Sequence, residues 1–469
     1  MLFNSIEYLI FLPIVFVIYW LLKNSYKKQN ILLLISSYVF YGWWDYRFLS
    51  LIIFSSFLDY YVGQKIEEAI GEKSKKHWLL VSLCSNLGLL GIFKYYNFFA
   101  DSFASSMSTF GWEVNDLTLN IILPVGISFY TFQTLSYSID IYRNQIKASR
   151  DIVGFFTFVS LFPQLVAGPI ERASNLIPQI ENKRNLNVTL IKTGIFQIFI
   201  GLFRKVAIAD NLGVYVDSVY GNYEIHNSST LLIATVFYAF QIYFDFSGYS
   251  DIAIGSAKLF GFNFNRNFNF PYFSKTLTEF WRRWHMSLSF WLRDYLYISL
   301  GGNRKGIVIT YRNLLLTMLI GGLWHGSSWN FVIWGGIHGL FLSLEKYTFS
   351  ALKIKTFNAF GYIYTFIVVL ISWIFFRAPD LKSASTIISE IFSFNYGALF
   401  IGDINAFVNA LLLLSIGFLI DLKIFRSNVS LEDYGVRFST VRLSIIISVI
   451  ILMLCLFYST AENFIYFQF

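Results

Sequence analysis

Long apolar runs separated by short polar loops are the dominant pattern of this chain. They lie near residues 6–22, 31–44, 78–98, 119–141, 189–202, 229–246, 362–376, 407–422 and 441–458, with a further run that ends at Lys65. A bilayer core needs about 20 residues of helix to cross it, and unbroken apolar runs favour helices over alternating strands. The pattern therefore predicts an all-α polytopic membrane protein with about 11 to 12 transmembrane helices.

Two regions depart from this pattern. Residues 155–180 are apolar but contain three prolines. Proline breaks or kinks a helix, and broken backbone at membrane depth is tolerated only where it is buried in protein or lines a cavity. We therefore expect a re-entrant or interfacial element there. Asp245 and Asp251 lie at the ends of apolar runs, where helix capping and a functional role are equally favoured.

The loops are too short to hold a separate soluble domain. We therefore predict one integral-membrane domain over residues 1–469. Within it, residues 1–150 form the N-terminal helices. Residues 151–349 form the catalytic core with the re-entrant elements, and residues 350–469 form the C-terminal helices.

The charge distribution supports the membrane assignment. Only 14% of the residues are charged, against about 25% in a typical soluble domain. The net charge of +8 would suggest a nucleic-acid partner in a soluble protein, but here the basic residues collect in alternate loops. By the positive-inside rule these loops face the cytoplasm, which places the N-terminus outside. We expect contact with membrane lipid and no nucleic acid.

Three of the five histidines lie between Thr276 and Gly339. Ionisable groups are costly in hydrocarbon, so residues of this kind in an apolar chain are candidates for function. Thr276 and Glu279 have the spacing of a capping box, which predicts the start of an amphipathic helix that continues to Tyr295. His285 would lie at the border between the aromatic face and the basic face of this helix. The basic face either meets lipid phosphates or contributes to a site.

The motif GLWHG carries the sharper signal. Glycines flank Trp324 and His325, and Ser327-Ser328 can cap a new helix, so His325 is expected at a break between two apolar helices. His338 lies in GGIHG, where a glycine spacing of four is usually a helix-packing face. A lone imidazole suits general-base catalysis, in which it takes a proton from a hydroxyl that attacks an activated acyl group. The spacing of the histidines predicts no metal site.

At these motifs the sequence resembles the membrane-bound O-acyltransferase family, most closely its bacterial alginate O-acetyltransferase-like branch. The motifs begin with LPVGISFYTFQTLSYSIDIYR from Leu123, FPQLVAGPIER from Phe162 and FDFSGYSDIAIG from Phe244. They continue with FWRRWHMSLSFWLRDYLYISLGGNR, GLWHGSSWNFVIWGGIHG and the terminal FIYFQF. The resemblance covers nearly the whole chain.

The resemblance implies a ring of membrane helices around a central, thinned funnel, with re-entrant helices near the active site. His325 would be catalytic, and His285 would be a second functional residue on the cytoplasmic side of the path. We assign to the substrate or donor path Trp324, Arg282, Arg283, Asp294, Asn330 and His338. No cofactor would be bound, because acetyl-CoA or another acyl thioester would enter as the donor substrate.

The implied activity is O-acetylation of an extracytoplasmic polysaccharide such as alginate, at the bacterial inner membrane. The acceptor would be the polymer itself or a periplasmic acetyltransferase partner. Alternative acceptors are peptidoglycan and lipopolysaccharide, and a more distant one is teichoic acid receiving D-alanine from a carrier-protein thioester. Two other classes stay open: a transporter or flippase for a lipid-linked sugar, and a structural subunit of a secretion complex.

Overall fold

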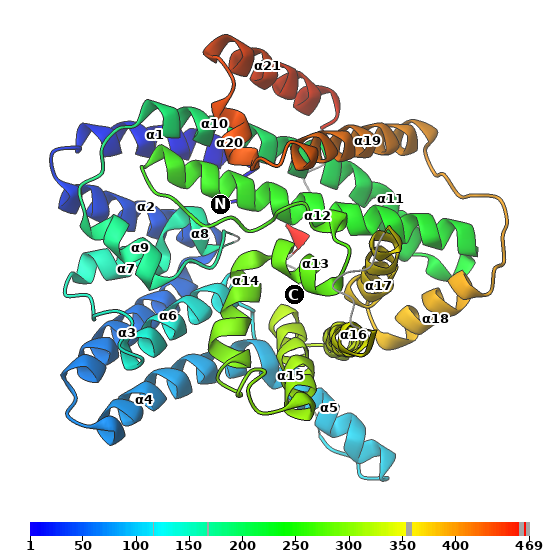
Figure 1. Cartoon of the computed structure of the whole chain (residues 1–469), viewed down its shortest axis with the longest axis horizontal. Helices are drawn as coiled ribbons and strands as arrows, with labels where there is room; N and C mark the ends of the chain where they lie inside the picture. The colour runs from blue at the N-terminus through cyan, green and yellow to red at the C-terminus, as the bar shows by residue number, and fades with distance from the viewer. Residues whose placement is uncertain (116, 167, 353–358, 459–463, 466–469) are drawn as a thin grey trace. The chain divides into compact units, whose positions relative to one another are not determined.

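The computed structural model describes residues 1–115, 117–166, 168–352, 359–458 and 464–465. The described residues form helices and connecting segments, with no β-strand among them (Figure 1). The prediction of an all-α polytopic protein is confirmed. Of the terminal FIYFQF motif, residues 466–469 lie outside the described part of the chain.

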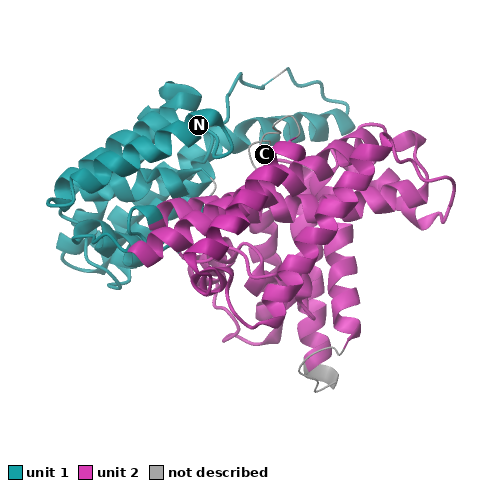
Figure 2. Cartoon of the chain, turned by 90° about the horizontal axis from the view of Figure 1, so that it is seen from above, with its two compact units in different colours: residues 1–187, 259–264 teal, residues 188–258, 265–469 magenta. Residues whose placement is uncertain are grey.

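The chain folds as two compact units (Figure 2). Unit 1 comprises Met1–Asn187 and Leu259–Phe264, and unit 2 comprises Val188–Lys258 and Asn265–Phe469. The α-helices of unit 1 are α1 (Ile6–Leu21), α2 (Tyr26–Asp45), α3 (Leu49–Glu68), α4 (Glu72–Leu90), α5 (Tyr96–Thr109), α6 (Ile127–Tyr142), α7 (Ile152–Ser160), α8 (Phe162–Leu165) and α9 (Ala173–Glu181).

The α-helices of unit 2 include the long α12 and the segments that carry the three histidines. They are α10 (Val188–Leu202), α11 (Asp210–Tyr220), α12 (Ser228–Leu259), α13 (Leu277–Arg283), α14 (Met286–Trp291), α15 (Ile307–His325), α16 (Trp329–Leu352), α17 (Phe360–Arg377), α18 (Leu381–Phe392), α19 (Ile404–Arg426), α20 (Leu431–Val436) and α21 (Thr440–Leu456).

Short 3-10 and π segments complete the described chain. The 3-10 segments are η1 (Tyr46–Phe48), η4 (Tyr223–Ile225) and η5 (Pro271–Phe273). The π segments are η2 (Gly91–Tyr95), η3 (Phe203–Ala209) and η6 (Leu292–Tyr297). Each π segment of the described chain contains a basic residue: Lys94 in η2, Arg204 and Lys205 in η3, and Arg293 in η6.

Within the described parts of the chain, five helical segments are long and apolar enough to cross a membrane: Glu72–Thr109, Ser228–Leu259, Ile307–His325, Phe360–Arg377 and Ile404–Arg426. Most of the predicted spans correspond to helices, but the one expected over 119–141 begins only at Ile127. Pro124 and Gly126 delay its start, since Gly126 has a φ of 76° and immediately precedes the helix. The predicted interruption of 155–180 is confirmed, because α7, α8 and α9 divide it.

Two aspartates predicted at the ends of apolar runs lie inside α12 instead. Asp245 and Asp251 are both buried within this 32-residue helix, so the capping interpretation is wrong. Lys205 Nζ lies 2.7 Å from Asp245 Oδ1 and 2.6 Å from Asp210 Oδ1. The carboxylate of Asp245, which the sequence pattern had placed at a helix end, is therefore stabilised inside the helix by ion pairing.

Arg204, the neighbour of Lys205 in η3, joins two helices in the same way. Its guanidinium lies 2.6 Å from Asp251 of α12 and 2.5 Å from Asp421 of α19, and Tyr243 donates a hydrogen bond of 2.7 Å to Asp421. Buried charges are stable only when they are paired in this manner. The π segment thus ties α12 and α19 to the core of unit 2.

The α15–α16 hairpin carries His325 and His338, and the close packing of its two helices depends on glycine. A Cβ atom at Gly322 would lie 2.1 Å from the carbonyl oxygen of Phe331, and one at Gly335 would lie 2.2 Å from that of Met318. Backbone atoms cannot move away from such a contact, whereas the end of a flexible side chain can. The predicted helix-packing role of the GGIHG glycines is confirmed at Gly335 and Gly339.

We expect Gly335→Ala to destabilise the protein by about 1–3 kcal/mol, the usual cost of overpacking. The new methyl group would push α16 away from the Met318 carbonyl. Thermal unfolding of the purified protein in detergent measures the effect. Gly336→Ala is the matched control, because its Cβ would meet only a Leu319 methyl at 3.6 Å. Equal melting temperatures for the two variants would contradict the packing argument.

Candidate active site

The helix predicted to run from Thr276 to Tyr295 is broken at His285. The predicted helix start is confirmed, since Thr276 Oγ1 accepts the Glu279 N–H at 3.0 Å, while Glu279 Oε2 accepts the N–H of Lys275, one residue before the cap, at 2.9 Å. Helix α13 ends at Arg283 and α14 begins at Met286, so the prediction of one continuous amphipathic helix is wrong. Between them His285 adopts a left-handed conformation with φ 42° and ψ 55°.

The break results from a neighbouring segment that takes over helical hydrogen bonds. The Met286 N–H donates to the Asn267 carbonyl at 2.8 Å, and the Asn269 N–H donates to the Arg283 carbonyl at 2.9 Å. In a continuous helix these groups would bond within the helix itself. Because Asn267 and Asn269 are distant in sequence, local periodicity cannot reveal this competition.

His285 is fully buried in an aromatic and amide environment. Its Nδ1 lies 3.2 Å from Asn267 Oδ1, and its ring centroid lies 4.7 Å from that of Phe246 in an edge-to-face arrangement. Burial lowers the pKa of His285 to about 3, because removal from water disfavours the charged ring. His285 lies outside the five candidate spans and is neutral at physiological pH.

His325 is the last residue of α15, as its glycine-flanked motif predicted. The chain resumes as a helix at Trp329, and Ser328 Oγ accepts the Asn330 N–H at 3.2 Å. Only 3% of His325 is exposed. Its ring contacts Trp334 and Phe376 with centroid distances of 4.9 and 5.4 Å. An aromatic cage therefore surrounds it.

The fold brings His285 and His325 together although they are far apart in sequence. Their ring centroids are 6.3 Å apart and the ring planes are inclined at 64°. Trp324 lies beside both, at 5.7 Å from His285 and 5.1 Å from His325. Two buried imidazoles at this separation can contact the same small substrate group.

His338 lies in the same aromatic cluster but uses both ring nitrogens in the packing of helices. Trp281 Nε1 donates to its Nδ1 at 3.4 Å, and its Nε2 lies 3.0 Å from Ser372 Oγ. Ser372 Oγ in turn donates to the Val369 carbonyl at 2.7 Å. This consistent set of bonds holds α13, α16 and α17 together and favours the packing interpretation of His338 over a place on the substrate path.

The other residues assigned to the path have separate structural partners. Arg283 Nη2 pairs with Glu279 at 2.9 Å, and Asp294 pairs with Arg293 at 2.6 Å. Asn330 Nδ2 donates to the Ala378 carbonyl at 2.7 Å and so joins α16 to the end of α17. Arg282 is exposed on α13. Of this group, Trp324 is the one that contacts both His285 and His325.

Several residues that form the site were not predicted from the sequence. Asn267 bonds to His285, Ser287 bonds to Asn267, and Trp334 and Phe376 enclose His325. Asn267 belongs to the segment NFNRNFNF, whose asparagines recur among phenylalanines. Buried amides in such an apolar segment require partners, which is the one signal that could have identified it.

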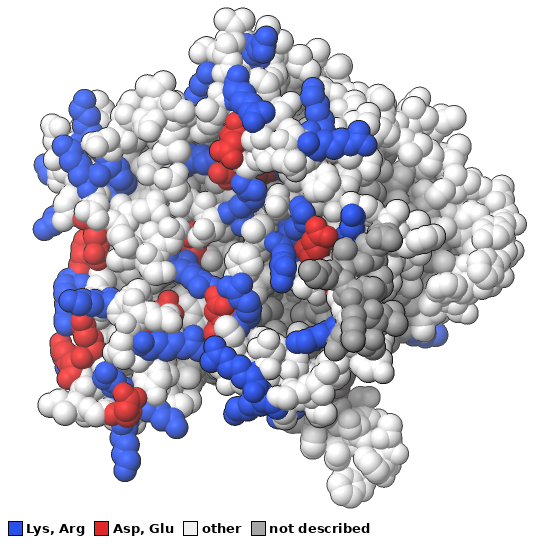
Figure 3. All heavy atoms as spheres, in the orientation of Figure 1, with Lys and Arg blue, Asp and Glu red and all other residues white. Residues whose placement is uncertain are grey.

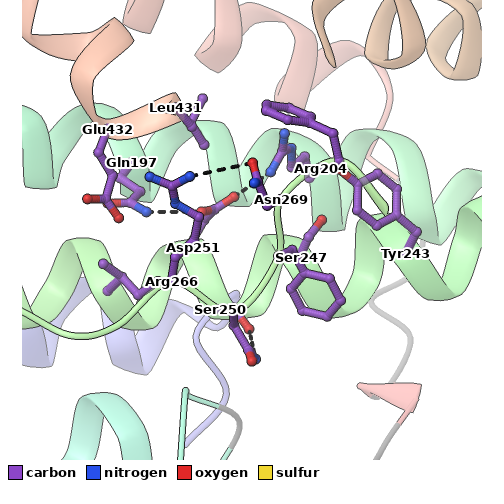
Figure 4. A pocket seen from close by; sticks show the side chains of 14 residues that line it. Gln197, Arg204, Tyr243, Ser247, Ser250, Asp251, Arg266, Asn269, Leu431 and Glu432 are labelled. Carbon is purple, nitrogen blue, oxygen red and sulfur yellow. Dashed lines mark hydrogen bonds and ion pairs between the residues drawn. The ribbon is translucent and has the colours of Figure 1, made fainter. Parts of the chain in front are cut away.

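Two neighbouring cavities approach the site and share Arg266, Asn269 and Phe270 in their linings. The larger has a volume of about 300 Å³ and is also lined by Arg283, Asn428 and Ser430. The smaller, of about 20 Å³, reaches Asn267 and the Arg204–Asp251 pair (Figure 4). Among the described residues, no group of three or more His, Cys, Asp or Glu side chains is placed to hold a metal ion.

The protein surface over this part of unit 2 is charged. Figure 3 shows Lys and Arg side chains over α13 and α20, with Asp and Glu between them. Arg266 and Arg283 of the larger cavity offer guanidinium groups, which bind carboxylates and phosphates through paired hydrogen bonds. Asp433 also lines this cavity, so its lining carries two guanidinium groups and one carboxylate.

Comparison with known proteins places the histidine region inside a family match. The sequence model of the membrane-bound O-acyltransferase family matches residues 142–384. A probable alginate O-acetylase of Pseudomonas putida is 44% identical over 398 residues, which cover 84% of this chain and 81% of that protein. The peptidoglycan O-acetyltransferase of Helicobacter pylori is 37% identical over 429 residues, which cover 84% and 80%. The teichoic acid D-alanyltransferase of Bacillus subtilis is 28% identical over 241 residues, which cover 49% and 60%.

Proposed function

Because this chain belongs to the membrane-bound O-acyltransferase family and is an acyltransferase of the membrane, we propose that it transfers an acetyl group from acetyl-CoA to an extracytoplasmic polysaccharide. The observation that carries the proposal is the pair of buried imidazoles, His285 and His325, with ring centroids 6.3 Å apart inside the matched region. An exopolysaccharide such as alginate is the first candidate acceptor, because the relatives at 44% identity are named for alginate.

The chemistry requires one base and one reactive thioester. The acceptor hydroxyl attacks the thioester carbonyl while its proton passes to the His325 imidazole. The C–S bond then breaks, and the departing thiolate takes up that proton, which leaves a free thiol and an O-acetyl ester. The aromatic cage of Trp334 and Phe376 keeps water from competing for the acyl group.

The donor would enter from the cytoplasmic face. In support, the cavity with Arg266 and Arg283 offers two guanidinium groups to the phosphates of CoA, and it adjoins the cavity that reaches Asn267. The alternating basic loops support a topology in the bacterial inner membrane with the N-terminus outside and the donor side inside. The acetyl group would then pass to the polymer or to a periplasmic acetyltransferase partner.

We expect Arg266→Ala to raise the KM for acetyl-CoA by about tenfold while kcat changes little, because a charge-assisted hydrogen bond to a phosphate contributes to binding in both ground and transition states. Release of CoA by purified protein with a polysaccharide acceptor measures both constants. Arg304→Ala, in the loop before α15, is the control. An unchanged KM would exclude this cavity as the phosphate site.

The same assay separates the proposal from its alternatives. Peptidoglycan, lipopolysaccharide and teichoic acid replace the acceptor, and a D-alanyl carrier-protein thioester replaces the donor. The 28% identity to a D-alanyltransferase makes that donor worth including. A lipid-linked sugar transporter would consume no thioester, and a structural subunit would keep its role when both histidines are replaced. Consumption of a carrier thioester but not of acetyl-CoA would overturn the donor assignment.

A further inference from the structure

The orientation of the Asn267 side-chain amide follows from its neighbours. Its Oδ1 lies 3.3 Å from the backbone nitrogen of Ser287 and 2.9 Å from Ser287 Oγ. A backbone N–H can only donate, so the amide atom that faces it must be the oxygen. On its other side, Asn267 Nδ2 donates to Ser250 Oγ at 3.0 Å. Both ends of the amide are thereby fixed.

This orientation decides which nitrogen of His285 carries the proton. His285 Nδ1 lies 3.2 Å from the same Oδ1 atom. Two acceptors at that distance would repel each other, so Nδ1 must be protonated and donate to Asn267. In a neutral imidazole the other nitrogen, Nε2, then carries the lone pair. Ser287 Oγ lies 3.5 Å from Nδ1 and donates to Asn267, so it does not compete as an acceptor.

The neutral state of the ring makes this assignment unique. Full burial of His285 lowers its pKa to about 3, so the doubly protonated form is absent near neutral pH. The charged ring would carry protons on both nitrogens and leave no basic atom. A single tautomer of the neutral ring therefore represents the resting protein.

Asn267 also fixes the backbone of His285. Its carbonyl accepts the Met286 N–H at 2.8 Å, next to the left-handed residue that separates α13 from α14. A non-glycine residue in this conformation is strained and persists only when its surroundings hold it. The same asparagine thus determines both where the imidazole lies and which of its nitrogens is basic.

We propose that Asn267 is a positioning residue that holds His285 as the Nδ1–H tautomer and leaves Nε2 as the nitrogen that accepts a hydrogen bond or proton from substrate. This role rests on the proposed function of His285 in acyl transfer. The hydrogen-bond assignment itself depends on the contacts of Asn267, Ser287 and His285 and on the burial of the ring, not on the activity. The two can therefore be tested separately.

The direct test is nitrogen NMR of protein labelled with ¹⁵N-histidine in lipid bilayers, with His285→Gln used to assign the signals. We expect His285 to show a protonated Nδ1 and an unprotonated Nε2 near neutral pH. A protonated Nε2, or a charged ring, would overturn the assignment whatever the activity. If the tautomer is as stated but His285→Gln retains full acyl transfer, the proposed function of His285 fails and the assignment stands.

Variants of Asn267 test its role. Asn267→Leu should mix the two tautomers and lower kcat by about 10–100-fold, by analogy with the loss of the hydrogen-bond partner that orients a metal-ligating histidine. Asn267→Asp keeps an oxygen acceptor for Nδ1 and should restore the single tautomer. Asn313→Leu is the control, because it removes a buried asparagine that bonds to the Leu300 and Gly302 carbonyls.

The Asn313→Leu protein should retain the native His285 signals even if its stability falls. If Asn267→Leu does not fold, the Asn267→Asp protein decides the question by itself, since its His285 must still carry the proton on Nδ1. A single Nδ1–H tautomer in folded Asn267→Leu protein would show that Asn267 does not control it. Mixed tautomers in Asn267→Asp would do the same.

Discussion

Acyl transfer by the His325→Ala protein should fall by about 10²–10⁴-fold, the usual contribution of a general base. The rings that enclose this imidazole, Trp324, Trp334 and Phe376, offer no basic nitrogen, and the second imidazole of the site, His285, lies 6.3 Å away between ring centroids. The loss should appear in kcat, since alanine leaves the arginine-lined cavity intact. Release of CoA from acetyl-CoA by the purified protein, with amounts of folded protein matched by size-exclusion chromatography, measures it.

His226→Gln is the matched control for this experiment. His226 lies outside the site, with its ring 4.7 Å from that of Phe400. It should retain the rate of the unaltered protein. Full acetylation by folded His325→Ala protein would exclude His325 as the base.

The largest expected effect on stability comes from Lys205→Met. The ammonium group of Lys205 lies between the buried carboxylates of Asp210 and Asp245. Its removal leaves two like charges without their counter-ion, and breaking a buried pair costs about 3–5 kcal/mol. We expect a marked fall in the thermal midpoint and in the yield of folded protein, measured in detergent by fluorescence-detected size exclusion.

A second substitution distinguishes lost charge pairing from lost packing. In Lys205→Met combined with Asp210→Asn and Asp245→Asn, no uncompensated carboxylate remains, so a substantial part of the stability should return. Arg150→Met serves as the surface control, because the Arg150 pairs with Glu67 and Glu68 are exposed and should contribute little. If Lys205→Met were as stable as Arg150→Met, the ion pairs would not hold unit 2 together.

The local sequence predicted the His325 break but could not predict the one at His285. Glycines on both sides of Trp324-His325 and the following serines are local signals, and the structure uses them as helix end and helix cap. Nothing of the kind surrounds His285. Its break depends on the hydrogen bond that the Asn267 carbonyl accepts from Met286 and on the one that the Asn269 N–H donates to Arg283, which local periodicity does not register.

The aspartates of α12 were misplaced for a related reason. In a local stretch of sequence, Asp251 looks like the end of an apolar run. Its burial is tolerable because it pairs with Arg204, which lies 47 residues earlier and outside any such stretch. The overall class was easier to predict, because length and apolarity of the runs are properties of each segment alone. The position of the two functional histidines in one site is a property of the tertiary structure.

The π segment η3 has a consequence for insertions and deletions. Its closing bond runs from the Asp210 N–H to the Lys205 carbonyl, five residues back, so this turn contains one residue more than an α-helical turn. Deleting a single residue here would let the helix continue as a regular α-helix, with every local hydrogen bond satisfied. It would also rotate the following residues by about 100° relative to those before it. A deletion that improves the helical hydrogen bonding would thus separate Arg204 and Lys205 from their carboxylates. The length of this segment is therefore fixed by the direction in which its side chains must point, more than by the stability of the helix.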